Sequence, residues 1–108
     1  MSIRNSVHLI GRTGSEVEIF NYENGGMKAT VSLATNDYYT NGNGEKVEDT
    51  QWHSIIAYGK TAEIMQKYVN KGKEIAIEGK LTYRSYDAQD GQKRYITEIR
   101  VNELVLFN

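Results

Sequence analysis

The hydrophobic period of this 108-residue chain changes once, and that change constrains the fold more than any other feature. Apolar residues alternate with polar ones over most of the sequence, at the two-residue period of β-strands. The segment KTAEIMQKYVNKG (Lys60–Gly72) instead has helical spacing and ends in a glycine, which is a stop signal. Its apolar positions are Ile64, Met65, Tyr68 and Val69. The sequence therefore predicts an all-β fold with one helix.

Five strand segments surround the predicted helix, three before it and two after it. They are Val7–Gly11 resuming at Val17–Tyr22, Met27–Thr35, Gln51–Tyr58, Glu74–Tyr86 and Arg94–Phe107. Glu23–Gly26 and Asp90–Gln92 carry turn signals, whereas the polar, glycine-rich Asn36–Asp49 indicates a long flexible loop. Five strands with a helix between the third and fourth is the order of an OB-fold, a five-stranded Greek-key barrel that commonly binds oligonucleotides or oligosaccharides.

Length and composition exclude several classes of protein. A chain of this length has room for one core, so residues 1–108 are expected to form a single domain. No stretch approaches the roughly 18 apolar residues of a membrane span, and the N-terminus has no apolar signal segment. The absence of cysteine excludes disulfides and thiolate metal sites and is compatible with a cytoplasmic location. No membrane partner is expected.

The third predicted strand is apolar on both of its faces. With a period of two, one side carries Trp52, Ser54, Ile56 and Tyr58, and the other carries His53, Ile55 and Ala57. A strand with one face in water would alternate apolar with polar residues. We therefore expect one face to fill the barrel or a contact between subunits.

The fourth predicted strand alternates more clearly. Its inward positions are predicted to be Ile75, Ile77, Leu81 and Tyr83, while Lys80, Arg84 and Tyr86 share the other face. That second face combines cations for phosphates with a ring for a base, as a groove for single-stranded nucleic acid requires. The net charge of −1 gives no general attraction to nucleic acid, but residues 55–108 carry nine Lys and Arg against seven Asp and Glu.

Several blocks of the sequence resemble the bacterial single-stranded DNA-binding protein (SSB) family. The longest is WHSIIAYGKTAEIMQKYVNKGKEIAIEGKL (Trp52–Leu81), joined by NGG (Asn24–Gly26), SLAT (Ser32–Thr35) and DGQKRYITEI (Asp90–Ile99). They occur in the family's order and span almost the whole chain. The resemblance implies a homotetrameric OB-fold protein that binds single-stranded DNA without sequence preference in replication, recombination and repair, with no catalytic activity and no cofactor.

The resemblance also implies a set of binding residues. The family's stacking positions fall on Tyr39, Trp52, Tyr58 and Tyr86, and its basic positions fall on Lys60, Lys71 and Arg84. Lys80 joins the expected phosphate contacts because it shares a predicted strand face with Arg84. His53 falls where the family has a contact between subunits.

Two departures from the family pattern affect what is expected. Tyr39 and Tyr86 stand where the family usually has tryptophan, which has a larger stacking area, so weaker binding per site is expected. The chain ends at VNELVLFN (Val101–Asn108) without the acidic C-terminal peptide that recruits other proteins in this family. Tail-mediated protein partners are therefore not expected from this sequence.

The sequence gives little support for a metal site or for catalysis. The sequence DYYTNGNGEKVE (Asp37–Glu48) matches parts of an EF-hand loop, but Tyr39 replaces the ligand at its third position and strands flank the segment. With two histidines and no cysteine, no zinc-ligand spacing exists. A primosome-type dimeric OB-fold adaptor protein is the alternative function, and a small OB-fold nuclease is a more distant one.

Overall fold

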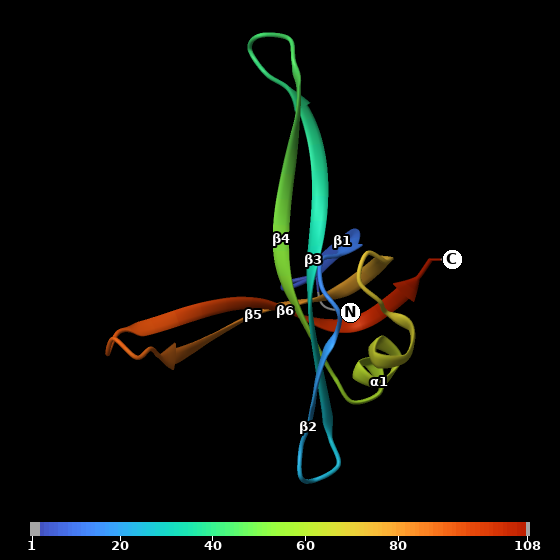
Figure 1. Ribbon diagram of the computed structural model, residues 1–108, viewed down its shortest axis with the longest axis vertical. Helices are drawn as coiled ribbons and strands as arrows, with labels where there is room; N and C mark the ends of the chain where they lie inside the picture. The colour runs from blue at the N-terminus through green and yellow to red at the C-terminus, as the bar shows by residue number, and fades with distance from the viewer. Residues whose placement is uncertain (1–2, 108) are drawn as a thin grey trace.

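The computed structural model describes residues 3–107, in which six β-strands and one α-helix follow one another (Figure 1). The elements are β1 (Val7–Thr13), β2 (Glu18–Asn21), β3 (Met27–Thr40), β4 (Lys46–Tyr58), α1 (Gly59–Tyr68), β5 (Glu74–Asp87) and β6 (Lys93–Leu106). The predicted first strand is therefore two strands, β1 and β2, and the predicted helix ends four residues early, at Tyr68. Val69 leaves the helix in an extended conformation, and Gly72 follows in the next turn with a φ of 83°.

Five of these strands close into a ring. β1 pairs antiparallel with β5 along its length and with β3 at its end, where Arg12 lies opposite Ala34. β5 pairs with β6, β6 runs parallel to β4 at Ile55 and Ile99, and β4 pairs with β3. The ring closes tightly, because a Cβ atom at Gly11 would collide with the carbonyl oxygen of Ala34. The predicted five-stranded OB-fold barrel is confirmed.

The two ends of the ring's first strand are tied to distant parts of the sequence. The side-chain amide of Asn5 donates to the carbonyl oxygen of Leu81 at 3.0 Å and accepts from the backbone N–H of Leu81 at 2.9 Å. At the other end, the hydroxyl of Thr13 donates to the carbonyl oxygen of Asn70 at 2.6 Å. β1 is thus fixed both to β5 and to the turn after α1.

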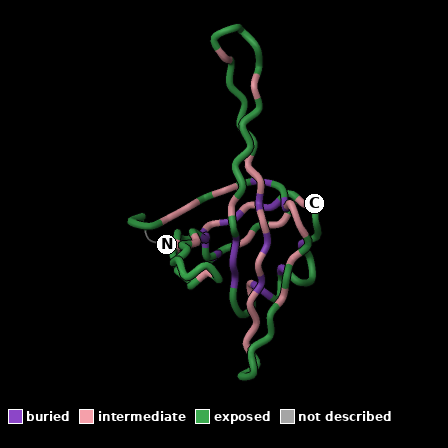
Figure 2. Tube along the Cα trace, turned by 60° about the vertical axis from the view of Figure 1, so that its left-hand side comes forward, coloured by how far each residue is buried: buried purple, intermediate pink, exposed green. Residues whose placement is uncertain are grey.

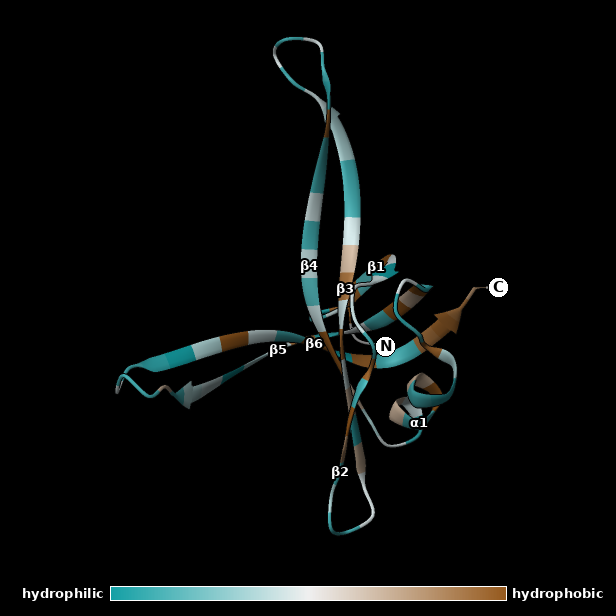
Figure 3. Ribbon diagram, viewed as in Figure 1, coloured by the Kyte–Doolittle hydropathy of each residue, from teal (hydrophilic) through white to brown (hydrophobic). Residues whose placement is uncertain are grey.

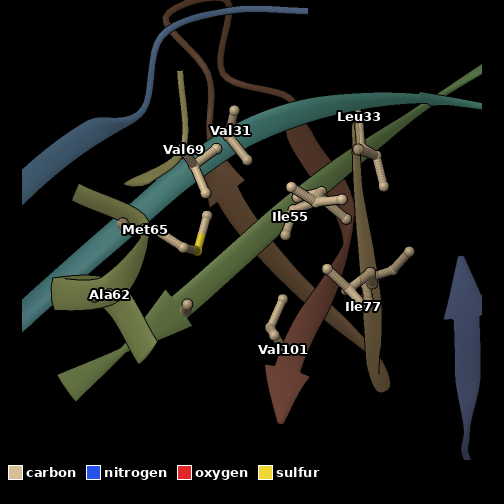
Figure 4. Packing of buried hydrophobic residues seen from close by; sticks show 12 residues of the cluster. Val31, Leu33, Ile55, Ala62, Met65, Val69, Ile77 and Val101 are labelled. Atoms are coloured by element: carbon tan, nitrogen blue, oxygen red, sulfur yellow. The ribbon is translucent and has the colours of Figure 1, made fainter. Parts of the chain in front are cut away.

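The core lies inside the barrel, and α1 covers one end of it. Alternate residues of the strands point inward, and α1 contributes Ala62 and Met65 on the side that packs against β3, β4 and β6. Figure 4 shows these side chains meeting Val31 and Ile55 in one apolar cluster. Leu33, Ile55, Met65 and Ile75 are the largest fully buried side chains.

The segment predicted to be a long loop is instead a two-stranded ribbon that projects from the barrel. Asn36–Thr40 of β3 pairs with Lys46–Thr50 of β4, a unit called the ribbon below. Only residues 41–45 form the turn, where the Asn41 side chain accepts from the N–H groups of Asn43 and Glu45 at 2.9 and 3.0 Å. The ribbon is almost entirely exposed and hydrophilic (Figures 2 and 3). The loop prediction was therefore wrong. The sequence indicated a loop because neither face of the ribbon carries the apolar pattern of a strand.

A second hairpin, the arm, consists of Lys80–Asp87 of β5 and Lys93–Arg100 of β6 and also leaves the barrel (Figure 1). The pairing shifts register next to Gly79, where a Cβ atom would collide with the carbonyl oxygen of Arg100. Beyond that point the inward prediction for Leu81 and Tyr83 is wrong, since they are 36% and 72% exposed. Their alternation continues, but there is no longer a core beneath them.

Candidate nucleic-acid interface

The sides of four neighbouring strands that point away from the core form one continuous surface, called the outer face. Residues directly opposite each other in paired strands lie on the same side of a sheet. Ser32 lies opposite Ser54, Ile56 opposite Arg100, and Arg100 opposite Lys80, which joins β3, β4, β6 and β5. A groove of about 320 Å³ lies on this face. Its lining includes Ser15, Thr30, Ser54, Arg84, Ile96 and Glu98.

Trp52 projects from β4 on the outer face and is 63% exposed. Its indole rests against Gly14, because a Cβ atom there would lie 2.7 Å from Cη2 of the ring and closer still to Cζ3. The N–H of Gly14 donates to the carbonyl oxygen of Ser32 at 2.9 Å, which holds this backbone beside the strand. Trp52 is therefore an exposed ring supported by a fixed backbone segment. The sequence pattern gave no sign of this role for Gly14.

Tyr58 ends β4 on the same side as Trp52 and is 39% exposed. The guanidinium carbon of Arg100 lies 4.7 Å from the centre of the Tyr58 ring, within the range of a cation–π interaction. This contact restrains the ring and places a positive charge beside it. Arg100 was absent from the residues that the sequence singled out.

Arg84 and Glu98 form an ion pair on the outer face. Nε of Arg84 donates to one carboxylate oxygen of Glu98 at 2.9 Å, and Nη2 donates to the other at 3.4 Å. The Glu98 side chain is 10% exposed, whereas that of Arg84 is 55% exposed. The hydrogen bonds to Glu98, followed by its charge, raise the pKa of the Arg84 guanidinium above its ordinary value. Arg84 therefore keeps its positive charge, which lies directly against the carboxylate of Glu98.

The remaining expected cations lie in three places. Lys80 is opposite Arg100 and joins the outer face, while Lys60 is exposed in the first turn of α1, close in sequence to Tyr58. Lys71 lies in the turn after α1, where its N–H donates to the Glu16 carboxylate at 3.2 Å. That turn is bound to the end of β1, so Lys71 lies outside the four strands of the outer face.

The expected stacking tyrosines lie on the two projecting hairpins. Tyr86 is 48% exposed near the tip of the arm, on the side that carries Arg84. Tyr39 is 55% exposed in the ribbon, but the alternation places it on the side of His53 and away from Trp52. Tyr38 is the ribbon tyrosine on the side of Trp52. It is 56% exposed, and Nζ of Lys46 lies 4.7 Å from its ring centre.

His53 lies where the ribbon joins the barrel. Nε2 of its ring is 2.9 Å from the Thr35 hydroxyl oxygen, so the imidazole is hydrogen-bonded within the chain and half-buried. Residues 3–107 contain no cluster of three or more side chains suited to a metal ion. Within the same residues, no helix has the length and apolar character to cross a membrane.

Comparisons with known proteins agree on one relationship. The family model described as "Single-strand binding protein family" matches residues 4–107. A single-stranded DNA-binding protein of Bacteroides thetaiotaomicron is 43% identical over 106 residues, which cover 96% of this chain and 66% of the relative. A solved structure described as "Plasmodium falciparum SSB complex with ssDNA" superposes with a TM-score of 0.89 at 32% identity, covering 100% of this chain and 97% of that one.

Proposed function

This chain belongs to the single-strand binding protein family, and from that premise we propose that it binds single-stranded DNA without sequence preference. The observation that carries the proposal is the outer face, where exposed rings and cations lie side by side on a rigid sheet. Trp52 and Tyr58 offer π-surfaces, and Lys80 and Arg100 bring positive charge next to them. The arrangement meets the two needs of such binding, stacking for bases and charge for phosphates.

The physical basis of the binding would be sequence-independent. Every base has a π-face, so stacking on Trp52 and on the other expected rings of the outer face, Tyr58 and Tyr86, contributes roughly 1–3 kcal/mol per base whatever its identity. On the ribbon, Tyr38 lies on the side of Trp52 and is proposed to take the stacking role expected for Tyr39. Lys60, Lys71, Lys80 and Arg84 would meet phosphates, with the charge of Arg84 shared with Glu98. No bond is made or broken in this activity, and it needs no cofactor. Affinity should fall as salt rises, through counterion release.

The biological unit that we propose is a homotetramer. Support comes from a second surface, on β1, β5 and β6, where a depression of about 550 Å³ is lined mainly by apolar side chains. Ile10 of β1 and Val105 of β6 are 63% and 53% exposed there, on the two strands that flank β5, and together they form an exposed aliphatic patch. His53 is proposed to lie near another contact between copies, so that changing its ring should lower the stability of the assembly. Such a protein would keep DNA strands unpaired during replication, recombination and repair in the bacterial cytoplasm.

The experiment that tests this function is a titration with oligo(dT), monitored by tryptophan fluorescence at low and high salt. Trp52 is the only tryptophan, so the signal reports one position in each chain. Strong quenching that weakens with salt would support stacking on Trp52, and the stoichiometry would give the site size. Neither quenching nor binding, together with a dimeric mass, would favour the adaptor function. Shortening of the oligonucleotide during incubation would indicate a nuclease.

A further inference from the structure

An aromatic and cationic cluster lies on the hairpin formed by β2 and β3, and its two rings, Phe20 and Tyr22, are outside the set of expected stacking residues. Phe20 and Tyr22 are 54% and 40% exposed, and their rings meet edge to face with centres 5.0 Å apart. Nζ of Lys28 lies 5.5 Å from the centre of the Phe20 ring, which is a cation–π contact. Two rings and a cation are thus held together on a surface hairpin.

Core packing does not explain these rings. β2 pairs with β3 alone among the described strands, and its alternation divides its residues between two sides. Ile19 is the residue that packs against the core cluster, so Phe20 points away from it. A short strand needs one apolar side to attach to a barrel, and Ile19 supplies it. An exposed phenylalanine beside it calls for another explanation.

The cluster is continuous with the outer face. Phe20 lies opposite Lys28, and Lys28 lies opposite Tyr58, so all three side chains are on the same side of the sheet. Arg100 lies over the other end of this row, against the Tyr58 ring. Rings and cations therefore alternate across β2, β3, β4 and β6. Neighbouring strands are about 4.8 Å apart, which places Phe20 roughly 10 Å from Tyr58.

We propose that this row extends the path of single-stranded DNA onto the β2–β3 hairpin, where Phe20 stacks a base and Lys28 contacts a phosphate. Tyr22 supports the Phe20 ring from its edge. Alternating rings and cations suit single-stranded DNA, because each nucleotide offers a base to a ring and a phosphate to a cation. The positive charge of Lys28 complements the phosphate. The inference rests on the proposed function, because it concerns the length and course of the same binding surface.

The test compares Phe20→Leu with the unchanged protein on oligo(dT) of increasing length. Leucine keeps apolar bulk beside Lys28 and removes the π-face, and thermal unfolding checks that the fold is intact. Long oligonucleotides should bind the Phe20→Leu variant about fivefold more weakly than the unchanged protein, which is the lower end of the effect expected for the loss of one stacked base. The shortest oligonucleotides should bind the two proteins equally. Lys28→Gln should reduce the slope of log affinity against log salt by about 0.7. Tyr68→Ala, which removes an exposed ring from α1, is the matched control and should bind normally.

A second measurement locates the DNA directly. Oligo(dT) carrying 5-iododeoxyuridine should crosslink to the peptide that contains Phe20 when irradiated in the complex. Equal affinity of Phe20→Leu at every length, or no crosslink in that peptide, would overturn the inference while leaving the proposed function intact. A change in assembly mass without a change in affinity would also overturn it, by showing that the cluster joins copies of the chain. If the unchanged protein does not bind oligo(dT), both proposals fail.

Discussion

Replacing Glu98 with glutamine should strengthen the binding of single-stranded DNA, because it frees a positive charge on the outer face. Arg84 now donates to both oxygens of the Glu98 carboxylate, and the two charges cancel. Glutamine retains a carbonyl oxygen of nearly the same shape, so it can still accept one bond from the guanidinium. The groove would gain one net positive charge in each chain with little change in structure.

The size of the effect follows from counterion release. Each additional phosphate contact on a single strand steepens the slope of log affinity against log salt by about 0.7. Between 1 M and 0.1 M salt, one such contact would therefore raise affinity by about fivefold relative to the unchanged protein. The gain should nearly vanish at 1 M salt. An increase that persists at high salt would point to better packing and not to charge.

Fluorescence titrations of the two proteins with a short oligo(dT), over a range of salt concentrations, measure this slope. Glu63→Gln is the matched control, since it makes the same change in net charge at an exposed position in α1 and should leave the slope unchanged. Arg84→Gln should destabilise the fold by leaving the buried Glu98 carboxylate unpaired, and adding Glu98→Gln should restore stability. An identical slope for Glu98→Gln and the unchanged protein would refute the reasoning, by showing that Arg84 lies away from phosphates.

Three further predictions concern other parts of the molecule. Gly14→Ala should displace the Trp52 indole from Gly14, shift the maximum of tryptophan emission and weaken oligo(dT) binding. Thermal stability should change little, because the ring can turn into solvent. Tyr38→Ala should weaken oligo(dT) binding more than Tyr39→Ala, because Tyr38 shares the side of Trp52, and equal losses in a titration would contradict this assignment. Ile55→Ala should lower the free energy of unfolding by about 2–5 kcal/mol in urea denaturation, since its side chain is fully buried, whereas a loss below about 1 kcal/mol would mean that the core collapses around the cavity.

The barrel could be predicted from the sequence because its strands have one apolar side. In Met27–Thr35 the alternation of Ala29, Val31 and Leu33 with polar residues matches the observed burial residue by residue. The ribbon could not be predicted in this way, because polar residues occupy both of its sides and only backbone pairing defines it. On the arm, the alternation was read correctly, but the sequence does not show where a hairpin leaves the core. Tyr83 was therefore predicted inward although it lies in solvent.

The candidate site divides along similar lines. Trp52 and Tyr58 share a strand, and their common side follows from spacing alone. The contacts that adjust the site join residues that are distant in sequence, such as Arg84 with Glu98 and Arg100 with Tyr58. These depend on the register between strands, and single-sequence patterns leave that register open. The assignment of Tyr39 came from resemblance, which does not state on which side of a twisted ribbon a ring lies.

The closure of the ring also bears on how the chain folds. β1 pairs with β5, and Asn5 exchanges two hydrogen bonds with Leu81 across 76 residues of sequence. Such contacts stabilise the chain only after a long loop has been closed, which costs conformational entropy. Each subunit should therefore fold in milliseconds to seconds, as barrels rich in distant contacts do. The sequence contains no proline, so refolding should lack the slow phase of prolyl isomerisation that takes about 10–100 s at 25 °C. Formation of the β1–β5 pairing would then limit the rate at which each subunit becomes competent to assemble.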